Sequence, residues 1–195
     1  MKGEESYSNP AASDEALMKL IAGGDDEAFR ELVERHQSLV IGTVARMIGS
    51  ADAEDVSQQV FLNVWKSAPR WRSQAAFTTW LLTITKRLVF NESRRRSRAR
   101  LIPQSRDEKS EHEVTDSKPG PDGAVLNNEL HMAIESAMFS LSERERLAVI
   151  LQQHEGMPYE EIAVVLEISL PAVKSLLFRA RNILKEKLAR YLCDS

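Results

Sequence analysis

One segment near the middle of the chain contains almost nothing that could enter a hydrophobic core. Between positions 103 and 123 the single aliphatic residue is Val114, and the segment ends in Lys118-Pro119-Gly120-Pro121-Asp122-Gly123. Such a stretch cannot bury enough apolar surface to offset the entropy lost on ordering, so it is expected to be a linker. Its 21 residues span about 25 Å as a flexible coil and at most roughly 70 Å when extended. The chain is therefore predicted to form two modules, 1–102 and 124–195, joined by a flexible acidic linker at 103–123.

The N-terminal module shows apolar residues at helical spacing throughout. Ser13 is a candidate cap for a short helix that stops at Gly23 and Gly24, and a second helix stops at Gly49. A third helix begins after Ser50 with acidic residues in its first turn, where the helix dipole favours them. The longest helix follows, and its second half is too basic to be core.

The C-terminal module carries the pattern of a helix-turn-helix. Ser142 and Glu145 form a capping-box motif ahead of an apolar helix. Two further helices, 159–166 and one after the three-residue turn 167–169, are separated by a tight connection, and Pro158 is expected as the first residue of the earlier one. The predicted fold class is all-α, with two small helical domains and a helix-turn-helix in the second.

The net charge of −3 conceals a strong segregation of charge along the chain. Residues 1–34 carry −6, residues 86–100 carry +6 and residues 169–195 carry +4. Two separated basic patches are typical of a protein that touches a polyanion at two places, although either patch alone is also compatible with a solvated helix face.

The second helix of a helix-turn-helix enters the major groove of DNA, where its early turns meet base edges. Helical spacing groups Lys174, Ser175, Phe178 and Arg179 around one face, and Arg181 follows as a further base. These five residues are the candidate contacts to duplex DNA. A helical hairpin used for protein docking would show the same apolar pattern and remains the alternative.

A second candidate nucleic-acid site precedes the basic helix. Aromatic residues stand beside polar ones there, and this combination suits an unstacked base held between rings while cations hold the backbone. Helical stripes of such rings are more often core, so Phe77 and Trp80 are expected to be buried and Trp71 is left open.

The sequence contains no constellation typical of an enzyme, a cofactor site or a metal site. The four histidines have no ligand spacing, and the single cysteine, Cys193, excludes an internal disulfide and leaves redox sensing as a minor alternative. Asp52, Glu54 and Asp55 could suggest a metal site, but such acids are usually dipole partners or a docking face. With no membrane span or signal peptide in the pattern, a cytoplasmic protein is expected.

Three motifs in this order resemble the extracytoplasmic-function (ECF) sigma factors, the small two-domain initiation subunits of bacterial RNA polymerase. They are the acidic helix beginning Asp52-Ala53-Glu54-Asp55, the segment Phe77-Thr78-Thr79-Trp80 leading to Arg94-Arg95-Arg96, and Tyr159-Glu160-Glu161-Ile162-Ala163 followed by Val173-Lys174-Ser175. The resemblance extends from about Asp14 to Leu188.

The resemblance implies a role for each surface. The first motif would dock on the clamp coiled coil of the largest polymerase subunit, through Asp52, Glu54, Asp55, Gln58 and Gln59. The next segment would capture a flipped base of the minus-ten promoter element and hold the surrounding DNA, through Arg72, Ser73, Gln74, Phe77, Lys86, Arg87, Arg94 and Arg95. The C-terminal module would read the minus-thirty-five element. The implied partners are the polymerase core, promoter DNA and an anti-sigma factor.

This chain departs from the usual family pattern at several positions. Leu176 stands where arginine is common, Pro158 replaces the usual serine cap, and Glu167 replaces a frequent glycine. Ser73-Gln74 replaces Gly-Glu in the base-capturing loop, so the preferred base does not carry over.

A promoter-specific sigma factor without chemistry of its own is the function that the sequence favours. A sigma-like decoy that sequesters an anti-sigma factor would have no use for the basic Lys174 and Arg179. A dimeric helix-turn-helix repressor would leave the docking helix and the aromatic loop unexplained.

Overall fold

The computed structural model describes residues 12–73, 75–101 and 123–192, and these residues form helices, turns and loops without a strand. The all-α fold class is therefore confirmed for the described residues. The chain divides into two compact units, Met1–Val89 and Phe90–Ser195. This division falls inside a helix, whereas the sequence pattern places the boundary in the segment 103–123, most of which lies outside the described residues. The boundaries 1–102, 103–123 and 124–195 thus stay a prediction.

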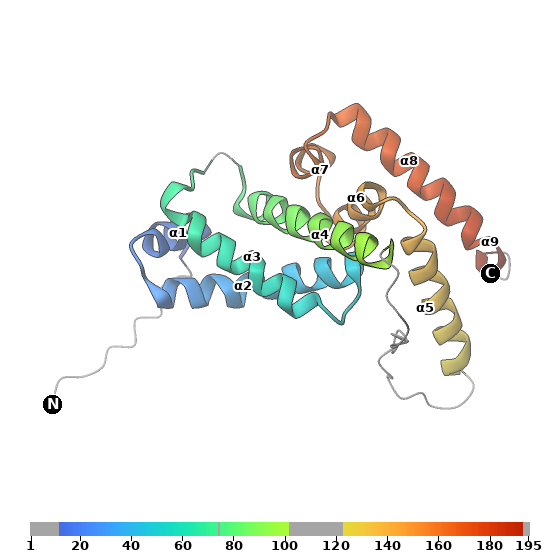
Figure 1. Ribbon diagram of the computed structural model, residues 1–195. Coiled ribbons are helices and arrows are strands. Elements are labelled where there is room, and N and C mark those ends of the chain that lie inside the picture. Colours follow the sequence, from blue (N-terminus) through green and yellow to red (C-terminus); the bar gives the residue numbers. More distant parts are fainter. Residues whose placement is uncertain (1–11, 74, 102–122, 193–195) are drawn as a thin grey trace. The chain divides into compact units, whose positions relative to one another are not determined.

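The first unit is built from helices that follow one another through short connections (Figure 1). They are α1 (Asp14–Ala22), α2 (Asp26–Ile48), α3 (Ala53–Ser67), the short 3-10 helix η1 (Ala68–Arg70) and the part of α4 (Phe77–Leu101) that ends at Val89. The long helix α2 packs against both α1 and α3. Fully buried side chains from each of these helices form the core, including Leu17, Leu32, Val44, Val60, Val64 and Leu81.

The helix ends in this unit follow the predicted local signals. The Ser13 hydroxyl accepts a hydrogen bond from Ala16 N at 3.2 Å, so the predicted cap is confirmed. Asp25 caps α2 in the same way, through Ala28 N at 3.0 Å. At the far end of α2, Gly49 adopts φ 92°, a conformation that L side chains rarely reach, and the helix stops there as predicted.

Besides the end of α4 from Phe90 on, the second unit contains α5 (Gly123–Phe139), α6 (Glu143–Gln153), α7 (Tyr159–Leu166), α8 (Leu170–Lys187) and α9 (Ala189–Leu192) (Figure 1). The helix α8 packs on α5, α6 and α7. The core of this unit is fully buried and largely aliphatic, with Leu147, Ile150, Leu151, Ile162, Val165 and Leu177 as its main members. The predicted helix-turn-helix is present as α7 and α8.

The helix-turn-helix connection contains the one strained residue of the described backbone. Glu167 is left-handed, with φ 57° and ψ 45°, and no other described residue except glycine has a positive φ. The Ile168 N–H donates to the Ala163 carbonyl at 3.1 Å, which closes the helix end in the manner of a Schellman motif. Ser169 then caps α8 by accepting from Ala172 N at 3.4 Å.

The predicted helix 159–166 is confirmed as α7, but the expectation that Pro158 is its first residue is wrong by one position. Pro158 is the N-cap of α7 rather than its first helical residue, because its ψ of 149° is extended. The proline at the start of a helix is instead Pro171, in the first turn of α8. The predicted capping box is confirmed, since Ser142 and Glu145 exchange both of its hydrogen bonds.

Within the described helices, none has both the length and the apolar composition that crossing a bilayer requires.

Candidate nucleic-acid and partner interfaces

The outer face of α8 carries the side chains predicted to meet duplex DNA. Lys174, Ser175, Phe178 and Arg179 are all exposed, and Phe178 is 64% exposed although it is a large apolar residue. The opposite face is core, where Val173, Leu176, Leu177 and Ala180 are buried. The exposed face therefore combines two cations, a hydroxyl and an aromatic ring.

Leu176 belongs to the buried side of this helix. Arginine is common at this position in the family that the chain resembles, so a DNA contact made by that arginine could be missing here. Because Leu176 is only 6% exposed, its side chain contributes to packing. The exposed surface of α8 is therefore formed by Lys174, Ser175, Phe178 and Arg179 and not by Leu176.

Two arginines of α8 have partners on other helices of the same unit. Arg179 Nε lies 3.6 Å from Glu145 Oε1 of α6, and this ion pair is 62% exposed on the arginine side and 13% on the glutamate side. Arg181 donates to the Tyr159 hydroxyl at 3.0 Å and to the Gln152 amide oxygen at 3.5 Å. Arg181 therefore braces α8 against α6 and α7, a role that the sequence pattern did not suggest.

The second half of α4 presents the other cationic surface. Arg87, Arg94, Arg95 and Arg98 are exposed there. Glu92 lies among them and accepts hydrogen bonds from Arg95 at 2.7 Å and from Arg96 at 2.9 Å. The hydrogen bond from Arg95 is the main cause that lowers the pKa of Glu92 from 4.5 to about 2, and Arg96 adds to it against the effect of burial.

Two of the predicted minus-ten residues are buried. Lys86 is 7% exposed and Phe77 is 2% exposed. Phe77 is thus in the core, as expected. Neither side chain is exposed enough to contact DNA directly. Helical spacing places the two residues on different sides of α4, with Phe77 near the buried Leu81 and Lys86 near the buried Leu82 and Val89.

An aromatic cluster lies beneath the loop that precedes α4. The Phe77 ring centroid is 5.6 Å from that of Trp80 and 6.4 Å from that of Trp71, and the two tryptophans are 6.1 Å apart. Both tryptophans are half-buried, so Trp80 is only partly in the core. Arg72 and Ser73 are exposed on the loop, and the predicted Gln74 lies outside the described residues.

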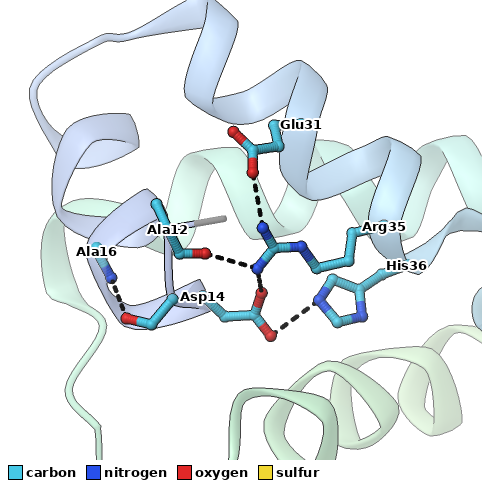
Figure 2. A network of polar contacts seen from close by, with 7 residues as sticks. Ala12, Asp14, Ala16, Glu31, Arg35 and His36 are labelled. Atoms are coloured by element: carbon cyan, nitrogen blue, oxygen red, sulfur yellow. Dashed lines mark hydrogen bonds and ion pairs between the residues drawn. The ribbon is translucent and has the colours of Figure 1, made fainter. Parts of the chain in front are cut away.

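The cluster is tied to the start of the chain's first helix through a histidine. The His36 ring centroid is 5.0 Å from that of Phe77, and its Nε2 lies 2.9 Å from Asp14 Oδ2. Figure 2 shows that Arg35 reaches the same Asp14 carboxylate, at 2.7 Å, and also contacts Glu31 and the Ala12 carbonyl. Sequence analysis missed this network, because its bonded members are up to 23 positions apart and follow no motif.

The helix α3 offers a polar face to solvent. Glu54, Asp55, Gln58 and Gln59 are exposed, and Asp52 is half-buried just before the helix. Leu62 is 45% exposed and follows Asp55, Gln58 and Gln59 at helical spacing, so it shares their face. Leu62 was not a predicted site residue. Its exposure in the structure marks it as part of this surface, whereas the apolar pattern of the sequence could not show that it faces solvent. Within the described residues, no group of three or more potential ligands could hold a metal ion.

Two families match the chain. Residues 32–99 match the family described as Sigma-70 region 2, and residues 131–184 match the family described as Sigma-70, region 4. The first match contains α3 and most of α4, and the second contains α7 and most of α8.

Named relatives match nearly the full length. An ECF RNA polymerase sigma-E factor of Escherichia coli (strain K12) is 31% identical over 181 residues, which cover 90% of this chain and 94% of the relative. The Haemophilus influenzae protein of the same name is 28% identical over 180 residues, covering 90% and 95%.

Solved structures agree with the fold. CnrH, solved in complex with the cytosolic domain of CnrY, matches with a TM-score of 0.66 at 26% identity, covering 92% of this chain and 99% of that one. The sigma factor RpoE of Bartonella quintana, solved with the anti-sigma factor NepR, has a TM-score of 0.64 at 20% identity, covering 84% and 98%, and supports the fold alone.

Proposed function

Because this chain belongs to the ECF sigma factors of the sigma-70 family, which are RNA polymerase-binding transcription initiation factors, we propose a division of labour between its surfaces. The unit containing α1 to α4 docks on the polymerase core and opens the minus-ten element. The unit containing the helix-turn-helix reads the minus-thirty-five element. The observation that carries this proposal is the exposed face of α8, where two cations, a hydroxyl and an aromatic ring point to solvent from a recognition helix.

Reading of the minus-thirty-five element is assigned to Lys174, Ser175, Phe178 and Arg179. Arginine can donate two parallel hydrogen bonds to guanine, and an exposed apolar ring can meet the methyl group of thymine. Lysine supplies a phosphate contact that carries no sequence information. Arg181 is exposed and supports this surface through its hydrogen bond to the Tyr159 hydroxyl, which holds α8 to α7.

Opening of the minus-ten element is assigned to the loop before α4 and to the arginines of α4. Extruding a base costs a few kcal/mol of unstacking, so a receiving pocket and phosphate contacts are both required. The loop residues are Arg72 and Ser73, which follow Trp71 of the aromatic cluster, together with Gln74, which lies outside the described residues. The phosphate contacts are Arg87, Arg94 and Arg95. Lys86 and Phe77 act from the core, where their burial places them.

Docking on the polymerase is assigned to the exposed face of α3. Glu54, Asp55, Gln58 and Gln59 supply acids and amides, Asp52 flanks them, and Leu62 adds an apolar centre. A polar rim around a smaller apolar area is the usual composition of a non-obligate interface. The partner surface is the clamp coiled coil of the largest subunit, as the family resemblance implies.

Three further assignments complete the proposal. Sigma factors are transcription factors rather than enzymes, and this chain leaves the chemistry to the polymerase. It works in the cytoplasm, where the polymerase and its template are. An anti-sigma factor restrains it; the support is that the similar CnrH was solved in complex with the cytosolic domain of CnrY.

Transcription in vitro with core polymerase and a promoter library tests the proposal. The expected result is selection of a start site behind one pair of promoter elements, which core polymerase alone does not select. Failure to direct initiation, together with tight binding to an anti-sigma domain, would instead identify a decoy.

A further inference from the structure

We infer that Glu145, on α6, is a positioning residue that orients Arg179 for reading a base. This inference rests on the proposed role of Arg179 at the minus-thirty-five element. Glu145 itself touches no DNA in this account. It acts on sequence discrimination through the arginine.

The carboxylate of Glu145 is held in place before it meets the arginine. Its Oε2 atom accepts hydrogen bonds from the Ser142 hydroxyl at 2.7 Å and from the Ser142 N–H at 3.1 Å. These bonds are part of the capping box that starts α6. The side chain is only 13% exposed, so its second oxygen, Oε1, is a fixed negative point beside α8.

The arginine meets this fixed point with one edge of its guanidinium group. Its Nε atom lies 3.6 Å from Glu145 Oε1, and in the described part of the chain Glu145 is the only ionic partner of Arg179. Guanidinium groups carry five donors in a rigid fork, so an ionic partner at Nε leaves the two terminal nitrogens available. Those nitrogens can form the bidentate contact to guanine O6 and N7.

The ion pair also weakens the binding of Arg179 to DNA of the wrong sequence. A long, exposed arginine without such a partner can turn toward any nearby phosphate, and phosphate contacts carry no sequence information. A carboxylate beside it repels the phosphate backbone and lowers the entropy still to be lost when the fork meets a base. Both effects favour base contact over non-specific contact, so Glu145 raises discrimination more than affinity.

The test compares Glu145→Gln with Glu143→Gln in the full-length protein assembled with polymerase core. Glutamine is an accepted partner in a capping box, so Glu145→Gln keeps the start of α6 while removing the charge. Glu143 is in the same first turn and has no ion pair with Arg179 among the described residues, so its variant reproduces the change in net charge. Unchanged thermal unfolding of both variants verifies the fold.

The readout is the ratio of holoenzyme affinities for the cognate promoter and for promoters substituted singly across the minus-thirty-five element. Glu145→Gln is expected to lower this ratio by about two- to fivefold at one base pair, in line with the strength of an exposed ion pair. Glu143→Gln is expected to leave it unchanged. An unchanged ratio in Glu145→Gln, or an equal loss in both variants, overturns the inference.

Arg179→Ala separates this inference from the function on which it rests. If Arg179→Ala lowers discrimination at the same base pair and adding Glu145→Gln causes no further loss, the glutamate acts through the arginine. If the double variant loses discrimination beyond Arg179→Ala, Glu145 acts independently and the inference fails. If Arg179→Ala alone leaves discrimination intact, the proposed reading role of Arg179 fails.

Discussion

His36 and Asp14 are joined by a hydrogen bond of 2.9 Å between the imidazole Nε2 and the carboxylate Oδ2. The imidazole is buried and its ring lies 5.0 Å from that of Phe77. Figure 2 shows the contact between His36 and Asp14, and together with the Phe77 ring contact it connects the starts of α1 and α4 through one side chain of α2. The loop assigned to base capture ends at Phe77, which belongs to this set of contacts.

Replacement of Asp14 by alanine is expected to destabilise the first unit by about 1–3 kcal/mol, because it leaves a buried imidazole nitrogen without its partner. Urea unfolding followed by the fluorescence of the nearby tryptophans measures the change. Glu31→Ala is the control, since it removes only an exposed i,i+4 ion pair with Arg35 and should cost less than about 1 kcal/mol. Equal losses in the two variants would contradict a special role for the histidine contact.

Arg146 closes the end of α5 and is expected to be the most costly arginine of the second unit to remove. Its guanidinium donates to the carbonyls of Met138, Phe139 and Leu141 at 3.0–3.2 Å and lies over the Phe139 ring. Burial lowers the pKa of Arg146, and the charge of Glu143 acts in the opposite direction.

Arg146→Ala should therefore lower the free energy of unfolding by about 2 kcal/mol, because three carbonyls lose a charged donor. The exposed Arg144, two positions away, is the matched control, and its alanine variant should stay within about 0.5 kcal/mol of the parent. Differential scanning calorimetry compares them. If Arg146→Ala had the same free energy of unfolding as the parent, the end of α5 would not depend on this side chain.

Glu167→Gly is expected to stabilise the helix-turn-helix. The left-handed backbone at Glu167 is unfavourable for any residue with a Cβ, so glycine should raise the free energy of unfolding by about 0.5–1 kcal/mol. Glu160→Gly, in the first turn of α7, should lower it by a similar amount because that residue is helical. Thermal unfolding of both variants is the measurement, and destabilisation by both would refute the strain argument.

The ion pairs of Glu92 predict a pH dependence in α4. Its pKa is lowered to about 2, so the stabilisation from Arg95 and Arg96 is complete above pH 4.5 and disappears as the pH falls through about 2. Carboxyl carbon shifts of Glu92, measured by NMR from pH 6 downward, should show a midpoint near 2. A midpoint near 4.5 would show that the two arginines do not hold the carboxylate in solution.

Local signals in the sequence predicted much of this fold because they act over a few residues. The Ser13 cap, the capping box of Ser142 and Glu145, and the stop at Gly49 each depend on hydrogen bonds or backbone angles within one turn. Helical spacing of aromatic residues likewise predicted that Phe77 lies in the core, and it does. Such features need no knowledge of the tertiary structure.

Contacts between helices could not be predicted in the same way. The partners Glu145 and Arg179, or His36 and Phe77, are far apart in sequence and meet only because of how the helices pack. Lys86 is a second case in which the sequence could not show how a helix packs. Its charge favoured a DNA contact, while the orientation of α4 buries it. The assignment of individual residues to DNA and polymerase stays a prediction for this reason.

The most direct measurement is permanganate reactivity of thymines in the minus-ten element when the full-length protein is mixed with core polymerase and promoter DNA. Unpaired thymines should appear with the parent protein. They should also appear with the control Glu34→Ala, which removes an exposed acid of α2. The double variant Asp55→Ala, Gln58→Ala should require about tenfold more protein to give the same signal, because assembly with core is weakened. A protein that never joins core polymerase, or a joined complex that leaves the DNA paired, would contradict the account.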